Sequence, residues 1–138
     1  NAILQFKQSG DRFAYTIPTM DVDSTTQGTA AVERPLRVPT GVKVLARLHA
    51  VMGAAGTGSD LGIIIYDPDL PTPSLPNNAS APLMQLFPQE AGVGYRSAGG
   101  ILEVWTNAAS GSVMSIGGQT LILRIVTTGW LDRRGRDD

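Results

Sequence analysis

The chain has 138 residues, a length at which folding buries roughly 65 to 70% of the unfolded surface, so we expect one domain. Sixteen glycines and nine prolines favour turns over long helices, and the absence of cysteine excludes disulfides and Cys-ligated zinc. Eleven basic and twelve acidic side chains give a net charge of −1, which argues against nucleic acid and anionic membranes as partners.

The N-terminal part of the chain is predicted to form three short β-strands separated by turns. Apolar and β-branched residues gather in these stretches, and glycine, proline or aspartate lie between them. The expected strands are 2–7, 13–17 and 30–38. The chain begins without a signal-peptide pattern and has no apolar run of ~18 residues, so we expect a protein that is neither exported nor inserted in a membrane.

Alternating oxygen-bearing side chains between the second and third strands resemble the start of a calcium-binding loop. The segment reads Asp21-Val-Asp23-Ser24-Thr25. Thr26 stands where such a loop needs glycine for its sharp turn, and Val32 stands where its final glutamate ligand belongs. We therefore predict no calcium site here, and no metal or cofactor elsewhere in the chain.

A strand with one buried face is predicted over residues 42–52. Every second side chain is apolar, and the positions between them include Lys43, Arg47 and His49. The apolar set is Val42, Val44, Ala46, Leu48, Ala50 and Met52. His49 is the single histidine, so any Ser-His-Asp triad would have to use it, and we interpret it as a surface-facing strand residue. With only isolated carboxylates besides, the sequence predicts no catalytic residues and no enzyme.

The middle of the chain is rich in glycine and proline. Residues 53–58, Gly-Ala-Ala-Gly-Thr-Gly, lack the spacing and the following lysine of a phosphate-binding loop, and are interpreted as hairpin glycines. Short strands are expected at 61–66 and 83–87. The proline-rich stretch 67–82 is predicted to cross between two sheets as a Greek-key return. Its Asp67 and Asp69 are expected to lie in a solvated turn.

The C-terminal part supplies the last three predicted strands, at 101–106, 112–116 and 120–128. The last of them is rich in β-branched residues and is expected to be buried on one face and nearly so on the other, which is typical of a central strand. About eight or nine short strands without an amphipathic helix predict an all-β fold, an antiparallel two-sheet sandwich with a jelly-roll-like arrangement. The eight aromatic residues are distributed about one per strand and are interpreted as core residues.

The single domain spanning residues 1–138 ends in a short charged tail, 132–138. Its three arginines are balanced by three aspartates, whereas nucleic-acid-binding arms depend on unopposed positive charge. A frayed, solvated end is one interpretation. The other is a segment that contacts a protein partner, because arginine pairs well with carboxylates and carbonyls.

We predict that Gly129 releases the chain from the last strand and that Trp130 covers apolar surface at the edge of the body. The residues expected to contact a partner are Trp130, Asp132, Arg133, Arg134 and Arg136.

The closing sequence LRIVTTGWLDRRGRDD, together with the β-rich body, resembles small virion proteins of tailed bacteriophages. The shared pattern is a terminal strand followed by Gly-Trp-hydrophobic-Asp-basic-Arg-Gly, and it covers residues 119–137. Among these proteins the chain is most similar to jelly-roll capsid cement, or decoration, proteins. Such proteins sit outside the shell on the major capsid protein, often as dimers, and the resemblance supplies no catalytic residues.

The resemblance implies a non-enzymatic structural protein on the outer surface of the virion, which binds the major capsid protein and reinforces the shell. A homodimer is also expected, because strand 61–66 carries so little charge that, as an edge strand, it would pair with a second copy. The alternative is a tail-fibre or receptor-binding head domain, whose loops 53–59 and 92–100 would recognise a host surface glycan or protein. A carbohydrate-active enzyme on a sandwich scaffold is a third class.

Overall fold

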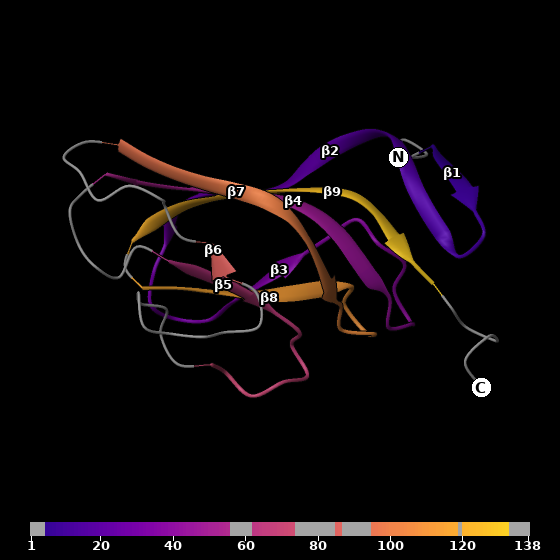
Figure 1. The fold of residues 1–138 in the computed structure, drawn as a ribbon. Coiled ribbons are helices and arrows are strands. Elements are labelled where there is room, and N and C mark those ends of the chain that lie inside the picture. Colours follow the sequence, from indigo (N-terminus) through magenta and orange to yellow (C-terminus); the bar gives the residue numbers. More distant parts are fainter. Residues whose placement is uncertain (1–4, 56–61, 74–84, 87–94, 119, 133–138) are drawn as a thin grey trace.

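In the computed structural model the described residues are 5–55, 62–73, 85–86, 95–118 and 120–132, and they form nine β-strands (Figure 1). The strands are β1 (Phe6–Ser9), β2 (Arg12–Gln27), β3 (Val32–Pro35), β4 (Leu45–Ala55), β5 (Ile63–Tyr66), β6 (Gln85–Leu86), β7 (Tyr95–Trp105), β8 (Ser112–Gly117) and β9 (Leu121–Leu131). Each predicted strand overlaps one of them, which confirms the prediction of an all-β chain. Within the described ranges no helix is long and apolar enough to span a bilayer.

The strands form a five-stranded sheet, β1-β2-β9-β4-β7, and a four-stranded sheet, β3-β8-β5-β6. β2 pairs with β9, β3 with β8, β4 with β7 and β5 with β6, as in one long hairpin with arms β2 to β5 and β6 to β9. Rolling that hairpin up brings β9 against β4 and β8 against β5. This is the eight-stranded jelly-roll arrangement, with β1 added at one edge. The predicted antiparallel two-sheet sandwich is confirmed.

The core lies between the two sheets, where their inward-facing side chains meet. On β4 every second residue from Ala46 to Met52 is fully buried, whereas Arg47 and His49 point outward, as the alternation predicts. β9 lies beside β4 and contributes a matching buried row, which consists of Leu121, Leu123 and Ile125. Each large aliphatic side chain buried in this way stabilises the fold by about 1.5 to 3 kcal/mol. The predicted core strands are therefore neighbours in one sheet.

β2 is much longer than predicted, because the strand does not end before Pro18. Its pairing with β9 is interrupted between Ala14 and Thr19, where β2 contains extra residues, and it then resumes. Proline has no N–H to donate to a ladder, so the chain bulges there and leaves Ile17 exposed. The β1–β2 hairpin, which turns at Gly10 with a φ of 62°, projects beyond the sandwich (Figure 1).

Two predictions about the middle of the chain are wrong. β5 lies inside the four-stranded sheet, between β8 and β6, and all four of its residues are buried. Its lack of charge therefore reflects burial on both faces and not an exposed edge. The stretch 67–82 joins β5 to β6, which are neighbours in one sheet, so it does not cross between sheets. Of this stretch, residues 74–82 lie outside the described ranges, as do residues 56–58 of the glycine-rich segment.

The end of β9 also differs from the prediction, because Gly129 does not release the chain. β9 continues through Gly129 to Leu131, and a Cβ added at Gly129 would lie 2.1 Å from the carbonyl oxygen of Phe13 on β2. Glycine is needed here because the two backbones approach closely. The Asp132 N–H then donates a hydrogen bond to the Asp11 carbonyl at 2.9 Å.

Replacing Gly129 with alanine is expected to destabilise the protein by more than about 2 kcal/mol, because the obstacle is backbone and cannot rotate away. The matched control is Gly28→Ala, where an added Cβ meets nothing within 4 Å, and which is expected to change stability by less than about 0.5 kcal/mol. Chemical denaturation of both variants measures the difference. Equal stability of the two would show that β2 and β9 do not approach as described.

Candidate functional site

On the outer face of the four-stranded sheet, the apolar side chains of β5 and β8 are covered by the chain itself. Ile64, Tyr66 and Ile116 point away from the main core, yet each is at most 3% exposed. Leu70 and Pro71 lie against the first two of them around a cavity of about 30 Å³. Part of the proline-rich stretch therefore acts as a cover for this face.

The outer face of the five-stranded sheet is open. The pairing registers place four large apolar side chains on it, and all are exposed: Met20 at 47%, Val51 at 38%, Ile101 at 62% and Trp105 at 45%. Polar side chains, including His49, lie between them on the same face. Exposed apolar residues gathered on one sheet face mark an interaction surface.

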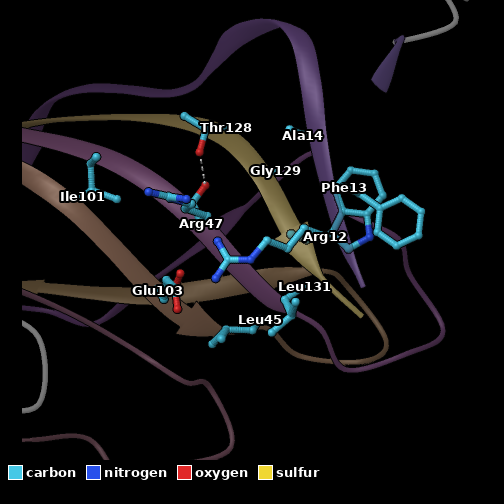
Figure 2. Close-up of a pocket in the computed structure, with 11 residues that line it drawn as sticks. Arg12, Phe13, Ala14, Leu45, Arg47, Ile101, Glu103, Thr128, Gly129 and Leu131 are labelled. Carbon is cyan, nitrogen blue, oxygen red and sulfur yellow. Dashed lines mark hydrogen bonds between the residues drawn. The ribbon is translucent and has the colours of Figure 1, made fainter. Parts of the chain in front are cut away.

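A pocket of about 330 Å³ lies on this open face, where β2, β9, β4 and β7 run side by side. Its side walls include Arg12, Leu45, Arg47, Ile101, Glu103 and Leu131 (Figure 2). Cross-strand pairing assembles them: Leu131 lies opposite both Arg12 and Leu45, and Arg47 lies opposite Glu103. The pocket thus combines aliphatic walls with three charged groups.

The three charged side chains of the pocket are exposed and make no ion pair within 4.0 Å with one another or with any other described residue. Figure 2 shows the Arg12 side chain reaching across β9 toward Glu103. The backbone of Arg47 is held in place, because the Thr128 hydroxyl donates a hydrogen bond to its carbonyl at 3.0 Å. Two guanidinium groups and one carboxylate leave the pocket one positive charge in excess.

Asp21 and Asp23, which resemble the start of a calcium-binding loop in the sequence, form ion pairs with arginines of the same chain. Asp21 is nearly buried and forms an ion pair with Arg37 at 3.0 Å, and it also accepts a hydrogen bond from Thr127. The Tyr15 hydroxyl donates to the Arg37 carbonyl. Burial, followed by the nearby charge of Asp21, raises the pKa of Tyr15, and Arg37 opposes this shift. Asp23 pairs with Arg124 at 3.0 Å.

Asp67 and Asp69 lie in the predicted turn and bind a single lysine. The Lys43 ammonium lies 2.7 Å from a carboxylate oxygen of each. Partial burial lowers the pKa of Lys43, but its hydrogen bonds and charge contacts with the two aspartates outweigh burial and raise it overall. The hydrogen bond from Lys43 is likewise the main cause that lowers the pKa of Asp69. The cluster ties the cover of the four-stranded sheet to the start of β4.

A further polar cluster joins β3 to β8. Ser110 and Ser112 both donate to Glu33, and their hydrogen bonds lower the pKa of its carboxyl. On the opposite side of β3, Arg34 binds the buried Gln27 at 2.6 Å, and burial lowers the pKa of this arginine. Within the described residues, no group of three His, Cys, Asp or Glu side chains could hold a metal ion.

Four aromatic residues from β1, β2 and β9 form a cluster at the hairpin end of the molecule. The rings of Phe13 and Trp130 stack at 5.1 Å, and Phe6 and Tyr15 pack against Trp130 at 5.5 and 5.4 Å. Trp130 is 8% exposed, so it covers apolar surface of its own chain, as predicted. A contact between Trp130 and a partner stays a prediction.

Of the other predicted contact residues, Asp132 follows β9 directly, and Arg133, Arg134 and Arg136 lie outside the described residues. The pocket is not predicted by the sequence patterns. The predicted strand places Arg47 on its outward face, which indicates an exposed charge there. Arg12 and Glu103 come near Arg47 only because of the order of the strands in the sheet, which the sequence pattern does not contain.

Comparison of the chain with models of known protein families, with curated proteins and with solved structures finds no significant match.

Proposed function

We propose that the chain is a non-enzymatic structural protein that binds the major capsid protein on the outer surface of a tailed phage and reinforces the shell. The proposal joins two supports. One is the resemblance of residues 119–137 to small phage virion proteins. The other is the jelly-roll body, whose five-stranded sheet exposes four large apolar side chains among polar ones on its outer face. In this proposal the outer face of the five-stranded sheet lies against the shell.

The observation that carries the proposal is the difference between the two outer faces. Ile64 and Tyr66 on one sheet are 1% and 3% exposed, whereas Ile101 and Trp105 on the other are 62% and 45% exposed. Full burial of a large apolar side chain is worth about 1.5 to 3 kcal/mol, and covering the exposed part of Ile101 or Trp105 gains a fraction of that. The apolar side chains on the outer face of the four-stranded sheet are thus covered, whereas those on the outer face of the five-stranded sheet are exposed. This difference supports binding through the five-stranded sheet.

Attachment to a shell suits a modest contact of this kind. Each copy would bury a small apolar patch between charged side chains, and the symmetry of a capsid repeats the contact many times. A contact that spans neighbouring capsid subunits gains further from effective concentration, because the second attachment is intramolecular. Reinforcement of the shell then comes from the sum of many moderate interactions.

The alternative function is a tail-fibre or receptor-binding head domain. It places recognition in loops 53–59 and 92–100, but residues 53–55 end β4 and residues 95–100 begin β7, so these nine residues are strand and not loop. The other seven residues lie outside the described ranges. The open sheet face, which is built from described strands, favours the structural role. Binding to host cells in place of capsids would support the alternative.

The homodimer also needs a different strand from the one predicted, because β5 is interior. β7 is the better candidate: it lies at the end of its sheet, and its eleven residues pair with β4 without a register shift. β1 and β3, also at sheet ends, have four residues each, and β3 ends in proline. Short strands and proline protect an edge, whereas a long regular edge invites pairing. We propose that two copies pair through β7.

Replacing Ile101 with aspartate is expected to lower binding to purified capsids of the encoding phage by about tenfold or more, because an apolar contact is lost and a charge is buried. The matched control is Ile17→Asp, since Ile17 is 76% exposed and lies in the irregular part of β2. Co-sedimentation with capsids measures binding, and unchanged melting temperatures show that both variants fold. Equal decoration by the wild type and Ile101→Asp would contradict docking through this face.

Lysine at Gly100 is expected to prevent pairing through β7, because a charge on an edge strand opposes addition of another strand. A Cβ added at Gly100 meets nothing within 4 Å, and the same is true of Gly28, whose lysine variant is the control. Sedimentation velocity over a range of concentrations should show a dimer for the wild type and Gly28→Lys, and a monomer for Gly100→Lys. A wild-type chain that stays monomeric at every concentration would contradict the proposal.

A further inference from the structure

We infer that the pocket between β2, β9, β4 and β7 receives an acidic side chain of a partner protein, held by Arg12 and Arg47, with an aliphatic neighbour on its apolar wall. The inference rests on the proposed function in one respect: it takes the open sheet face as the docking face. It adds the chemistry that the partner must present there.

The first argument is that two basic side chains of the pocket, those of Arg12 and Arg47, bind no described side chain. Apart from Arg96, whose side chain is not described, the described ranges contain seven basic residues, and four of them bind other side chains: Arg34, Arg37, Lys43 and Arg124. The remaining three are Lys7, Arg12 and Arg47, for which no side-chain hydrogen bond or ion pair with a described residue is formed. Two of these three therefore line one pocket.

The second argument is charge balance. Among the described residues that line the pocket, Glu103 is the single acidic one, and it lies opposite Arg47 on the neighbouring strand. One carboxylate can neutralise only one of the two guanidinium groups, so an excess positive charge faces any incoming group. Arginine presents a planar fork of N–H donors that matches a carboxylate, and the pairing is stronger in a partly desolvated pocket.

The third argument is the character of the walls. Leu45 and Leu131 are half-buried and Ile101 is largely exposed, so aliphatic surface surrounds the charged groups. A volume of about 330 Å³ is at the low end for a small-ligand site. A pocket of this size has room for one or two side chains.

An acidic sugar fits the pocket less well than an acidic side chain does. Several hydroxyl groups would need partners, and the neutral hydroxyl in the lining, that of Thr128, already donates to the Arg47 carbonyl. A glutamate or aspartate flanked by leucine, isoleucine or valine matches both the charge and the aliphatic walls. Specificity would come from the carboxylate, because a neutral amide in its place leaves the guanidinium groups without an anion.

The experiment is a solution NMR titration of the full chain with two capped tripeptides, acetyl-Leu-Glu-Leu-amide and acetyl-Leu-Gln-Leu-amide. Signals of the arginine Nε–H groups and of the Leu131 amide report on the pocket. The glutamate peptide is expected to bind about fivefold more tightly than the glutamine peptide, a preference that should shrink in high salt.

Three variants locate the preference. The ratio of the affinities for the glutamate and glutamine peptides should fall toward one in Arg12→Gln and in Arg47→Gln. It should be unchanged in Arg124→Gln, which removes the same charge from the same sheet face but outside the pocket lining. All three substitutions are at exposed positions, and unchanged amide spectra elsewhere would show that the variants fold. Galacturonate, titrated in parallel, tests whether the pocket binds an acidic sugar more tightly than the glutamate peptide.

Three results would overturn the inference: equal affinity for the two peptides, a preference that survives loss of either pocket arginine, or tighter binding of galacturonate than of the glutamate peptide. Absence of any shift at about 10 mM peptide would overturn it as well. These outcomes are separate from the capsid assay. The pocket can prefer glutamate while capsids fail to bind, and capsids can bind while the pocket shows no preference.

Discussion

The last strand of the chain, β9, runs between β2 and β4 and holds the five-stranded sheet together. Its inner residues Leu123 and Ile125 are fully buried, and its two ladders join the N-terminal strands to the middle of the chain. Without β9 this sheet would separate into β1-β2 and β4-β7. The close approach of β2 at Gly129 and the stack of Trp130 on Phe13 fasten its far end. The open outer face, and the pocket on it, therefore exist only when the final strand is in place.

Local sequence patterns located the strands, because a half-buried strand has a period of two that needs no knowledge of its neighbours. The run 42–52 shows this most clearly, since its apolar and polar positions became the inner and outer faces of β4. The extension of β2 beyond Pro18 was missed because proline usually ends a ladder, and here a bulge absorbs it. A bulge depends on the partner strand, which a local pattern does not contain.

Local patterns also do not contain the order of the strands in a sheet, and the pocket on the outer face depends on that order. Ile63–Tyr66 carries no charge and is therefore predicted to be an edge strand, but it lies between β8 and β6 in the four-stranded sheet. The aromatic cluster joins Phe6 and Phe13 to Trp130, more than a hundred positions away in the chain. In the same way Arg12, Arg47 and Glu103 come together only because β2, β9, β4 and β7 are consecutive in the sheet. The jelly-roll arrangement thus creates a site from residues that carry no joint signal in the sequence.

The covered sheet and the open sheet have different roles in this account. Tyr66 and its neighbours, with the proline-rich cover, complete the fold, while the face that carries Ile101 and Trp105 is left for a partner. A reconstruction of the phage particle at side-chain resolution tests that division most directly. We expect this chain to lie on the outer shell with its five-stranded sheet against capsid subunits. Density for the chain at the tail tip, or with the four-stranded sheet facing the shell, would contradict it.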